Sequence, residues 1–180
     1  MGKTAKKCLA LLGMGLLLGV PRPALPQSLE EQKVMAALTL NIVRFTTWPE
    51  EAAKPPKHSL DICVVGDNVV QQSFADIDQK AIGNKTLRVV ALTRLRNFED
   101  CQALYVSDLK QNILLQLFDE TKTQALLTIG EGYDFAAQGG MVGLENVDGK
   151  IALYINLPAM REANLQISAR LLKLAHIIGK

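Results

Sequence analysis

The stretch from Leu60 to Ile77, LDICVVGDNVVQQSFADI, carries the pattern that decides the fold. Its opening run, Leu60 to Val65, is almost continuously apolar, which is typical of a strand buried on both faces. Gly66 and Asp67 then form a turn, and Val69 to Ile77 follows with the spacing of a helix. A buried strand followed at once by a helix is the repeating unit of a parallel sheet covered by helices.

The same alternation continues toward the middle of the chain. Short apolar runs predict further strands at 87–92, 103–106 and 125–129, and an amphipathic segment predicts a helix over 111–121. Strands and helices that alternate in this way pack as layers. The sequence therefore predicts an α/β fold, a three-layer α/β/α sandwich with a mostly parallel sheet.

The last third of the chain departs from this alternation. Two apolar runs, 139–145 and 151–157, flank the turn Asn146-Val147-Asp148-Gly149, and Asp-Gly is a strong signal for a tight hairpin. We expect a C-terminal antiparallel hairpin added to the parallel sheet. Pro158 suits the first turn of a helix. Apolar residues from Leu165 to Ile178 recur at helical spacing and predict one closing helix.

A helix is also predicted before the first strand. Ser28 and Glu31 form the Ser-x-x-Glu pattern of a capping box. The helix is expected to stop near Trp48-Pro49, because the residue before a proline is pushed out of the α region. The face expected to dock on the core carries Val34, Leu38, Ile42 and Phe45.

The N-terminal residues 1–26 have the pattern of a secretory signal peptide and its linker. They hold four of the 20 basic residues and no acid, and an apolar run from Cys8 to Val20 that is too short to span a bilayer as a helix. We expect this segment to be removed on export across the membrane, which leaves 28–180 as a single α/β domain. An uncleaved N-terminal anchor is the alternative.

The charge balance argues against nucleic-acid binding. The whole chain has a formal charge of +2 and is 5% aromatic, so it offers neither a basic field nor a stacking platform for bases. Removal of the signal peptide leaves 16 basic against 18 acidic side chains, a formal charge of −2. A slightly acidic domain is more consistent with specific protein contact.

Two cysteines, Cys63 and Cys101, remain once Cys8 is removed with the signal peptide. In an oxidising compartment two cysteines most simply form one disulfide, and two separate buried thiols are the alternative. Neither cysteine belongs to a Cys-x-x-Cys pair, so redox catalysis has no local support.

The residues present no catalytic constellation. His58 and His176 each lack a second His or Cys at ligand spacing, so we expect no metal site, and His176 is expected near the C-terminus of the closing helix. Phosphate-loop, Gly-x-Ser-x-Gly and His-Glu-x-x-His motifs are missing from the sequence. We therefore expect a protein that is not an enzyme and that needs no cofactor.

Polar turns after three predicted strands keep a second function open. Asp67, Asp108 and Glu131 follow strands whose carboxyl ends converge on the crevice where parallel sheets bind ligands. A small-ligand-binding module is therefore the alternative function. Turns also favour these residue types for backbone reasons alone.

Two residues at the end of the first predicted helix are candidates for contact with a protein partner. Arg44 and Trp48 belong to residue types that are enriched at interface hot spots. A lone Trp at a helix end also serves as a partly buried contact of its own domain.

Six blocks of the sequence, in their order and spacing, resemble the YfiR/HmsC-like family. The similarity covers roughly Lys33 to Ile178. The blocks are NIVRFTTWP at 41–49, LDICVVGD at 60–67, CQALYVS at 101–107, GGMVG at 139–143, INL at 155–157 and LQISARLLKLA at 165–175.

The resemblance implies a periplasmic regulator without enzymatic activity, on an α/β sandwich fold. It implies that the protein binds the periplasmic domain of a YfiN-type diguanylate cyclase and represses it, and so controls cyclic-di-GMP and biofilm formation. A YfiB-type OmpA-like lipoprotein would sequester the regulator, and homodimerisation stays open.

The resemblance also bears on particular residues. Cys63 and Cys101 match the disulfide pair of the family, whereas the second cysteine pair of YfiR has no counterpart between Gly139 and Leu157. Whether redox control carries over is therefore open. Candidate contacts near the closing helix, in addition to Arg44 and Trp48, are Met160, Gln166 and Ser168.

Overall fold

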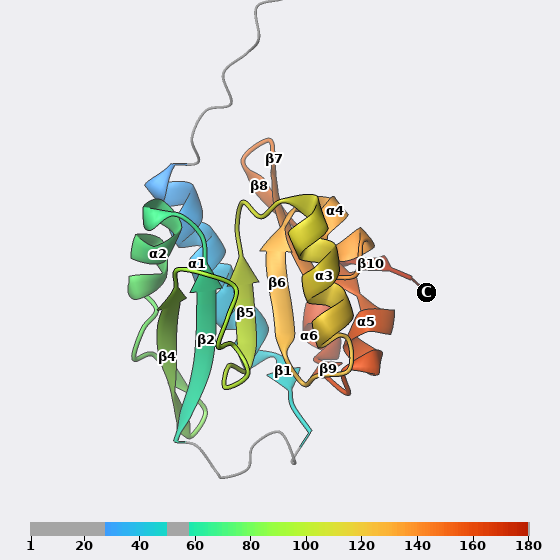
Figure 1. Ribbon diagram of the computed structural model, residues 1–180, viewed down its shortest axis with the longest axis horizontal. Coiled ribbons are helices and arrows are strands. Elements are labelled where there is room, and N and C mark those ends of the chain that lie inside the picture. The colour runs from blue at the N-terminus through green and yellow to red at the C-terminus, as the bar shows by residue number, and fades with distance from the viewer. Residues whose placement is uncertain (1–27, 50–57, 180) are drawn as a thin grey trace, which may run out of the picture.

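A central eight-stranded sheet organises the molecule (Figure 1). The computed structural model describes residues 28–49 and 58–179, so the expected signal peptide at 1–26 lies outside the described residues. In spatial order the strands are β10 (His176–Ile178), β8 (Lys150–Asn156), β7 (Val142–Val147), β6 (Leu127–Glu131), β5 (Ala103–Val106), β2 (Ser59–Val65), β4 (Lys85–Leu92) and β3 (Ala81–Ile82).

Most strand pairs in this sheet are parallel. β4, β2, β5, β6 and β7 all run in one direction, whereas β8 and β3 pair antiparallel with their neighbours β7 and β4. β1 (Thr46–Thr47) and β9 (Gln166–Ile167) form a separate two-stranded antiparallel sheet. The helices are α1 (Leu29–Arg44), α2 (Asn68–Ala75), α3 (Gln111–Thr121), α4 (Gly132–Ala137), α5 (Leu157–Glu162) and α6 (Ala169–Leu172).

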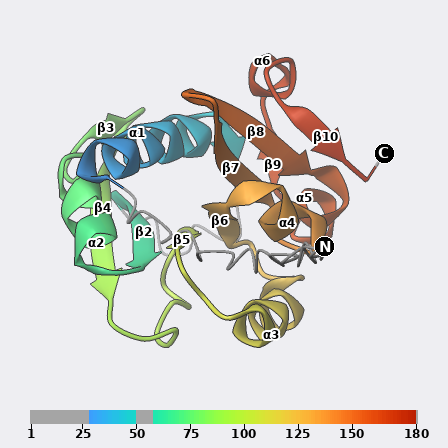
Figure 2. The same ribbon diagram turned by 90° about the horizontal axis from the view of Figure 1, so that it is seen from above.

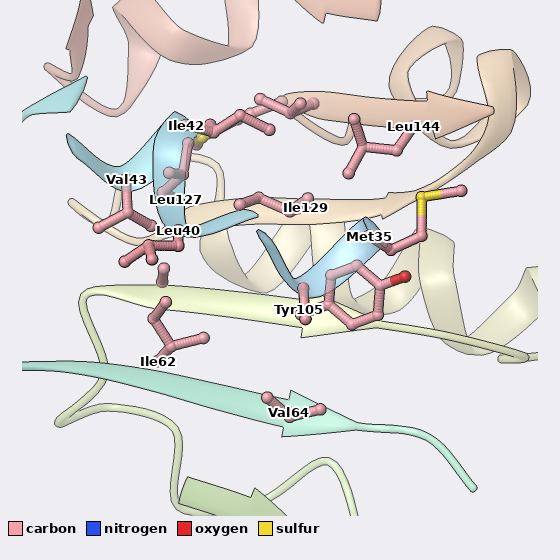
Figure 3. Close-up of a cluster of buried hydrophobic side chains, with 14 of the residues drawn as sticks. Met35, Leu40, Ile42, Val43, Ile62, Val64, Tyr105, Leu127, Ile129 and Leu144 are labelled. Atoms are coloured by element: carbon pink, nitrogen blue, oxygen red, sulfur yellow. The ribbon is translucent and has the colours of Figure 1, made fainter. Parts of the chain in front are cut away.

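Helices cover both faces of the sheet, which confirms the predicted α/β/α sandwich. Figure 2 shows α1 on one side of the strands and α3 on the other. β2 explains why, because Ile62 and Val64 point into a core cluster with α1, while Cys63 and Val65 point into a second cluster with α3. Figure 3 shows the first cluster, in which Met35 of α1 lies over the sheet.

None of the helices in the described residues is long and apolar enough to cross a membrane.

The first helix begins where expected but buries a different face. The Ser28 hydroxyl accepts the Glu31 backbone N–H at 3.2 Å, and the helix ends at Arg44. Val34 is 47% exposed and Phe45 38%, so the predicted docking face is wrong at both ends. The buried face of α1 includes two polar residues, Gln32 and Thr39, so the spacing of the apolar residues alone did not identify it. The buried residues are Gln32, Met35, Ala36, Thr39, Leu40, Ile42 and Val43.

The single closing helix predicted over 165–178 is wrong. The chain forms β9, then one short helix, α6, capped by Ser168, and then the edge strand β10. His176 therefore lies beside Tyr154 in a parallel strand pair and not at a helix C-terminus. Pairing with β8 satisfies the backbone groups on one side of β10, and the β-branched Ile177 and Ile178 suit a strand.

The predicted hairpin is confirmed. Val147 pairs with Lys150, which leaves Asp148 and Gly149 as a two-residue turn with φ values of 51° and 80°. The sequence did not predict α4, however, which begins at Gly132 directly after β6 ends at Glu131.

Candidate functional site

The short β1–β9 sheet joins two regions that the sequence analysis treated separately. Thr46 pairs with Ile167 and Thr47 with Gln166, and the Ser168 backbone N–H donates to the Phe45 carbonyl at 2.8 Å. The residues that follow α1 are thereby held against the residues that follow α5. Figure 1 shows both strands at the lower end of the molecule, where β5 and β6 begin.

A hollow of about 650 Å³ opens at this junction. Its volume falls in the range of small-molecule and side-chain binding sites. Trp48 and Gln166, both candidate contact residues, lie in its wall. The complete lining is Thr47, Trp48, Pro49, Arg161, Asn164, Leu165 and Gln166.

Trp48 is anchored in this wall by a hydrogen bond. Its indole Nε1–H donates to the Gln102 carbonyl at 3.1 Å, and the side chain is half-buried. Gln102 also ties β5 to β2, because its backbone N–H donates to the Asp61 carbonyl at 2.9 Å and its Oε1 accepts the Asp61 N–H at 2.8 Å. The Trp48 ring is therefore fixed to the turn that precedes β5, at the amino end of that strand.

The disulfide lies beside this anchor. Cys63 of β2 and Cys101 form the bridge, with their Cα atoms 5.9 Å apart, and both side chains are buried in the second core cluster. Cys101 is the residue immediately before Gln102. The covalent link and the Trp48 hydrogen bond thus converge on one turn.

An ion pair between the buried Asp61 of β2 and the half-exposed Arg88 of β4 supports the same region. Asp61 is 1% exposed, and its carboxylate accepts hydrogen bonds from Nε of Arg88 at 2.9 Å and from the Nη2 of the same guanidinium. The carboxylate raises the pKa of Arg88 by hydrogen bonding and by its charge. Arg88 therefore stays protonated, and the buried carboxylate keeps its counter-charge.

Arg161 supplies a cation to the hollow. It lies exposed near the end of α5, and within the described ranges no ion pair or side-chain hydrogen bond is recorded for it. A guanidinium beside an indole ring suits an anionic or aromatic group of a partner. The sequence analysis missed Arg161 because no motif marks it and only the fold brings it to Trp48.

The other candidate contact residues lie elsewhere. Met160 is 1% exposed and belongs to the core, so its side chain does not lie on a contact surface. Arg44 is exposed, but its Nη2 donates to the Ala81 carbonyl at 3.0 Å, next to β3. Ser168 is half-buried and accepts the Arg170 backbone N–H at 3.3 Å as the cap of α6.

The three strand-end acids do not form a common site. Asp67 caps α2 by accepting the Val70 N–H at 2.9 Å, and Asp108 is an exposed turn residue with a φ of 52°. Glu131 accepts hydrogen bonds from Ser107 at 2.7 Å and Gln32 of α1 at 3.3 Å. Each acid has a local role, and the crevice expected at these strand ends lies under the start of α1.

Metal binding has no support in the described segments, which contain no group of three or more His, Cys, Asp or Glu side chains that could hold an ion.

Comparison with curated proteins returns no match. A family model described as YfiR/HmsC-like matches residues 32–176, which cover most of α1 and of the sheet, the disulfide and the hollow described above. The chain belongs to the YfiR/HmsC-like family.

Proposed function

We propose that the protein represses a membrane-bound diguanylate cyclase of the YfiN type by binding its periplasmic domain at the hollow beside Trp48. The family is one of periplasmic, non-catalytic regulators of diguanylate cyclase signalling, and this chain matches its model over 32–176. The observation that carries the proposal is the meeting in one open hollow of an anchored Trp and an exposed Arg that has no ion pair within 28–49 and 58–179.

The residue types in the hollow suit contact with a protein. Trp and Arg are the side chains most enriched among interface hot spots, because they bury large areas and still form directed polar contacts. The Gln102 carbonyl fixes the Trp48 ring, so little conformational entropy is lost when a partner covers it. Arg161 would pair with a carboxylate of the cyclase domain.

The proposal includes two further consequences for signalling. Binding would lower the synthesis of cyclic-di-GMP and so reduce biofilm formation. A YfiB-type lipoprotein would relieve repression by occupying the regulator. Because the domain has no counterpart of the second YfiR cysteine pair, we assign no redox control to the region from 139 to 157.

The first test measures binding of the purified protein to the periplasmic domain of the cyclase by calorimetry. We expect a micromolar or tighter complex, which Trp48→Ala weakens by about 30-fold or more, the loss typical of a hot spot. Arg161→Glu should also weaken binding, and it changes an exposed side chain that the fold does not need. Arg94→Ala, an exposed arginine in the loop before β5, is the matched control and should bind normally.

The outcomes separate the function from the site. Lack of binding by the unchanged protein would remove the proposed function. Binding that survives both Trp48→Ala and Arg161→Glu would keep the function and remove the hollow as its surface. In membranes that carry the cyclase, the protein should lower cyclic-di-GMP production in proportion to binding.

A further inference from the structure

Three aromatic rings lie in a row on the face of the sheet that carries α4. Tyr133 of α4 contacts Tyr154 of β8 at a centroid distance of 5.4 Å and an angle of 82°. Tyr154 contacts His176 of β10 at 5.3 Å and 31°. Tyr133 is 50% exposed and His176 is also exposed, so the row is open to solvent. Single exposed aromatic side chains are ordinary, but a contiguous exposed group of them is typical of an interaction site.

Backbone contacts hold this row in place. Gly143 of β7 has no side chain, and a Cβ there would lie 2.2 Å from the Gly132 carbonyl oxygen, so α4 can rest directly on the strand. Tyr133, the next residue of α4, is thereby held against Tyr154. His176 is the register partner of Tyr154 in the adjacent strand. The rings are therefore positioned before any partner arrives.

A carboxylate lies beside the rings. Glu145 is two residues beyond Gly143 on β7 and so lies on the same face of the sheet, opposite the small Ala152. Burial, and then the nearby Glu145 carboxylate, raise the pKa of Tyr154. Among the described residues no ion pair is recorded for Glu145. Asp134, adjacent to Tyr133, is exposed and adds further negative charge.

We propose that Tyr133, Tyr154 and Glu145 form a docking site for an arginine side chain of a protein partner. The faces of the rings carry negative potential, and a cation placed over them gains electrostatic attraction. A guanidinium is planar, so it can lie on a ring while its N–H groups reach the Glu145 carboxylate. Because half of the Tyr133 side chain is exposed, a side chain that protrudes from a protein partner can reach its ring.

This site is separate from the hollow beside Trp48 and does not depend on the proposed function. The hollow contains its own cation, Arg161, and is built from β1, β9, the end of α5 and the residues after it. The aromatic site is built from α4, β7, β8 and β10. In Figure 1 α4 lies toward the upper right, away from β1 and β9.

The test titrates the purified protein with blocked arginine, N-acetyl-arginine amide, while NMR follows the ring protons of Tyr133, Tyr154 and His176. We expect saturable shifts of these protons. Tyr133→Ala and Glu145→Gln should each weaken binding by about 2- to 5-fold, the strength of an exposed cation–π contact. Tyr133→Phe keeps the ring face and should bind normally, as should Glu99→Gln, an exposed acid at a distance.

Blocked citrulline has the shape of arginine without the charge, and it should cause no saturable shift. Equal shifts with citrulline, or no saturable shift with arginine, would overturn the site. Unchanged affinity in both Tyr133→Ala and Glu145→Gln would also overturn it. Choline bound more tightly than the arginine probe would overturn the assignment to a guanidinium. If Tyr133→Ala fails to fold, Glu145→Gln compared with Tyr133→Phe decides the question.

Discussion

The two ends of the parallel strands differ in how far they are covered. At the carboxyl ends, Glu131 accepts hydrogen bonds from Ser107 and from Gln32 of α1, so the helix covers the place where such sheets usually bind ligands. At the amino ends, the disulfide and Gln102 link β2 to the turn before β5, and an open hollow lies beside Trp48. The hollow therefore lies at the opposite end of the strands from the place where parallel sheets usually bind ligands.

The largest expected effect is loss of the disulfide at the amino ends. The bridge between Cys63 and Cys101 spans a sequence separation of 38, and the chain-entropy model gives about 4 kcal/mol for a loop of that size. We expect reductant to lower the free energy of unfolding by about 2 to 4 kcal/mol in urea titrations. The Cys63→Ala, Cys101→Ala double variant should lose at least as much, because it also removes buried sulfur atoms.

The same experiment distinguishes the two ends. Trp48 is the only tryptophan, so its fluorescence reports on the amino ends alone. Before global unfolding, reductant should change this fluorescence and leave amide exchange of Gln32 in α1 unchanged. An unchanged melt after confirmed reduction, or equal loosening at both ends, would contradict the contrast drawn here.

The next effect concerns pH and the carboxyl ends. Tyr105 is fully buried, and burial together with the nearby Glu131 raises its pKa. Because the folded pKa lies above the unfolded value of about 10, the neutral phenol stabilises the fold below that pH and this contribution is lost as pH rises. Above about pH 10 the loss should approach 1.4 kcal/mol per pH unit relative to Tyr105→Phe. If the free energy of unfolding fell equally with pH in the unchanged protein and in Tyr105→Phe, this role of Tyr105 would be refuted.

The fold was predictable where local pattern and tertiary burial agree. β5 and α3 have the predicted bounds, and β2 starts one residue early. Strands buried on both faces are mostly apolar, and the amphipathic spacing of α3 marks the face that it buries. The pattern failed on α1, where Gln32 and Thr39 are fully buried beside Met35. It failed again at the C-terminus, because the pairing of β10 with β8 is a non-local contact that helical spacing cannot reveal.

The candidate site was predictable only in parts. Trp48 was named from its residue type and Gln166 from its place near the expected closing helix. Their meeting depends on the pairing of β1 with β9, two strands of two residues each. Strands that short carry no pattern of their own. Arg161 follows from neither motif nor period, and Met160 was named although helix packing places it in the core.

The smallest expected effect is that of Trp48→Phe at the amino ends. Phenylalanine keeps an aromatic ring in the hollow but removes the N–H that donates to the Gln102 carbonyl. That carbonyl also accepts the Leu127 backbone N–H at 2.9 Å, so it does not lose its last partner. The free energy of unfolding should therefore fall by only about 0.5 to 1 kcal/mol, measured by urea titration.

The matched change at the carboxyl ends is Ser107→Ala, which removes the 2.7 Å donor to the Glu131 carboxylate. Hydrogen bonds to charged groups are stronger, so this change should cost about 1.5 to 3 kcal/mol. An equal or larger loss for Trp48→Phe would mean that the indole hydrogen bond holds the amino ends together, and the ring could not then be regarded as available to a partner. A small loss, with binding to the cyclase domain kept within a few-fold, would assign Trp48 to the partner surface.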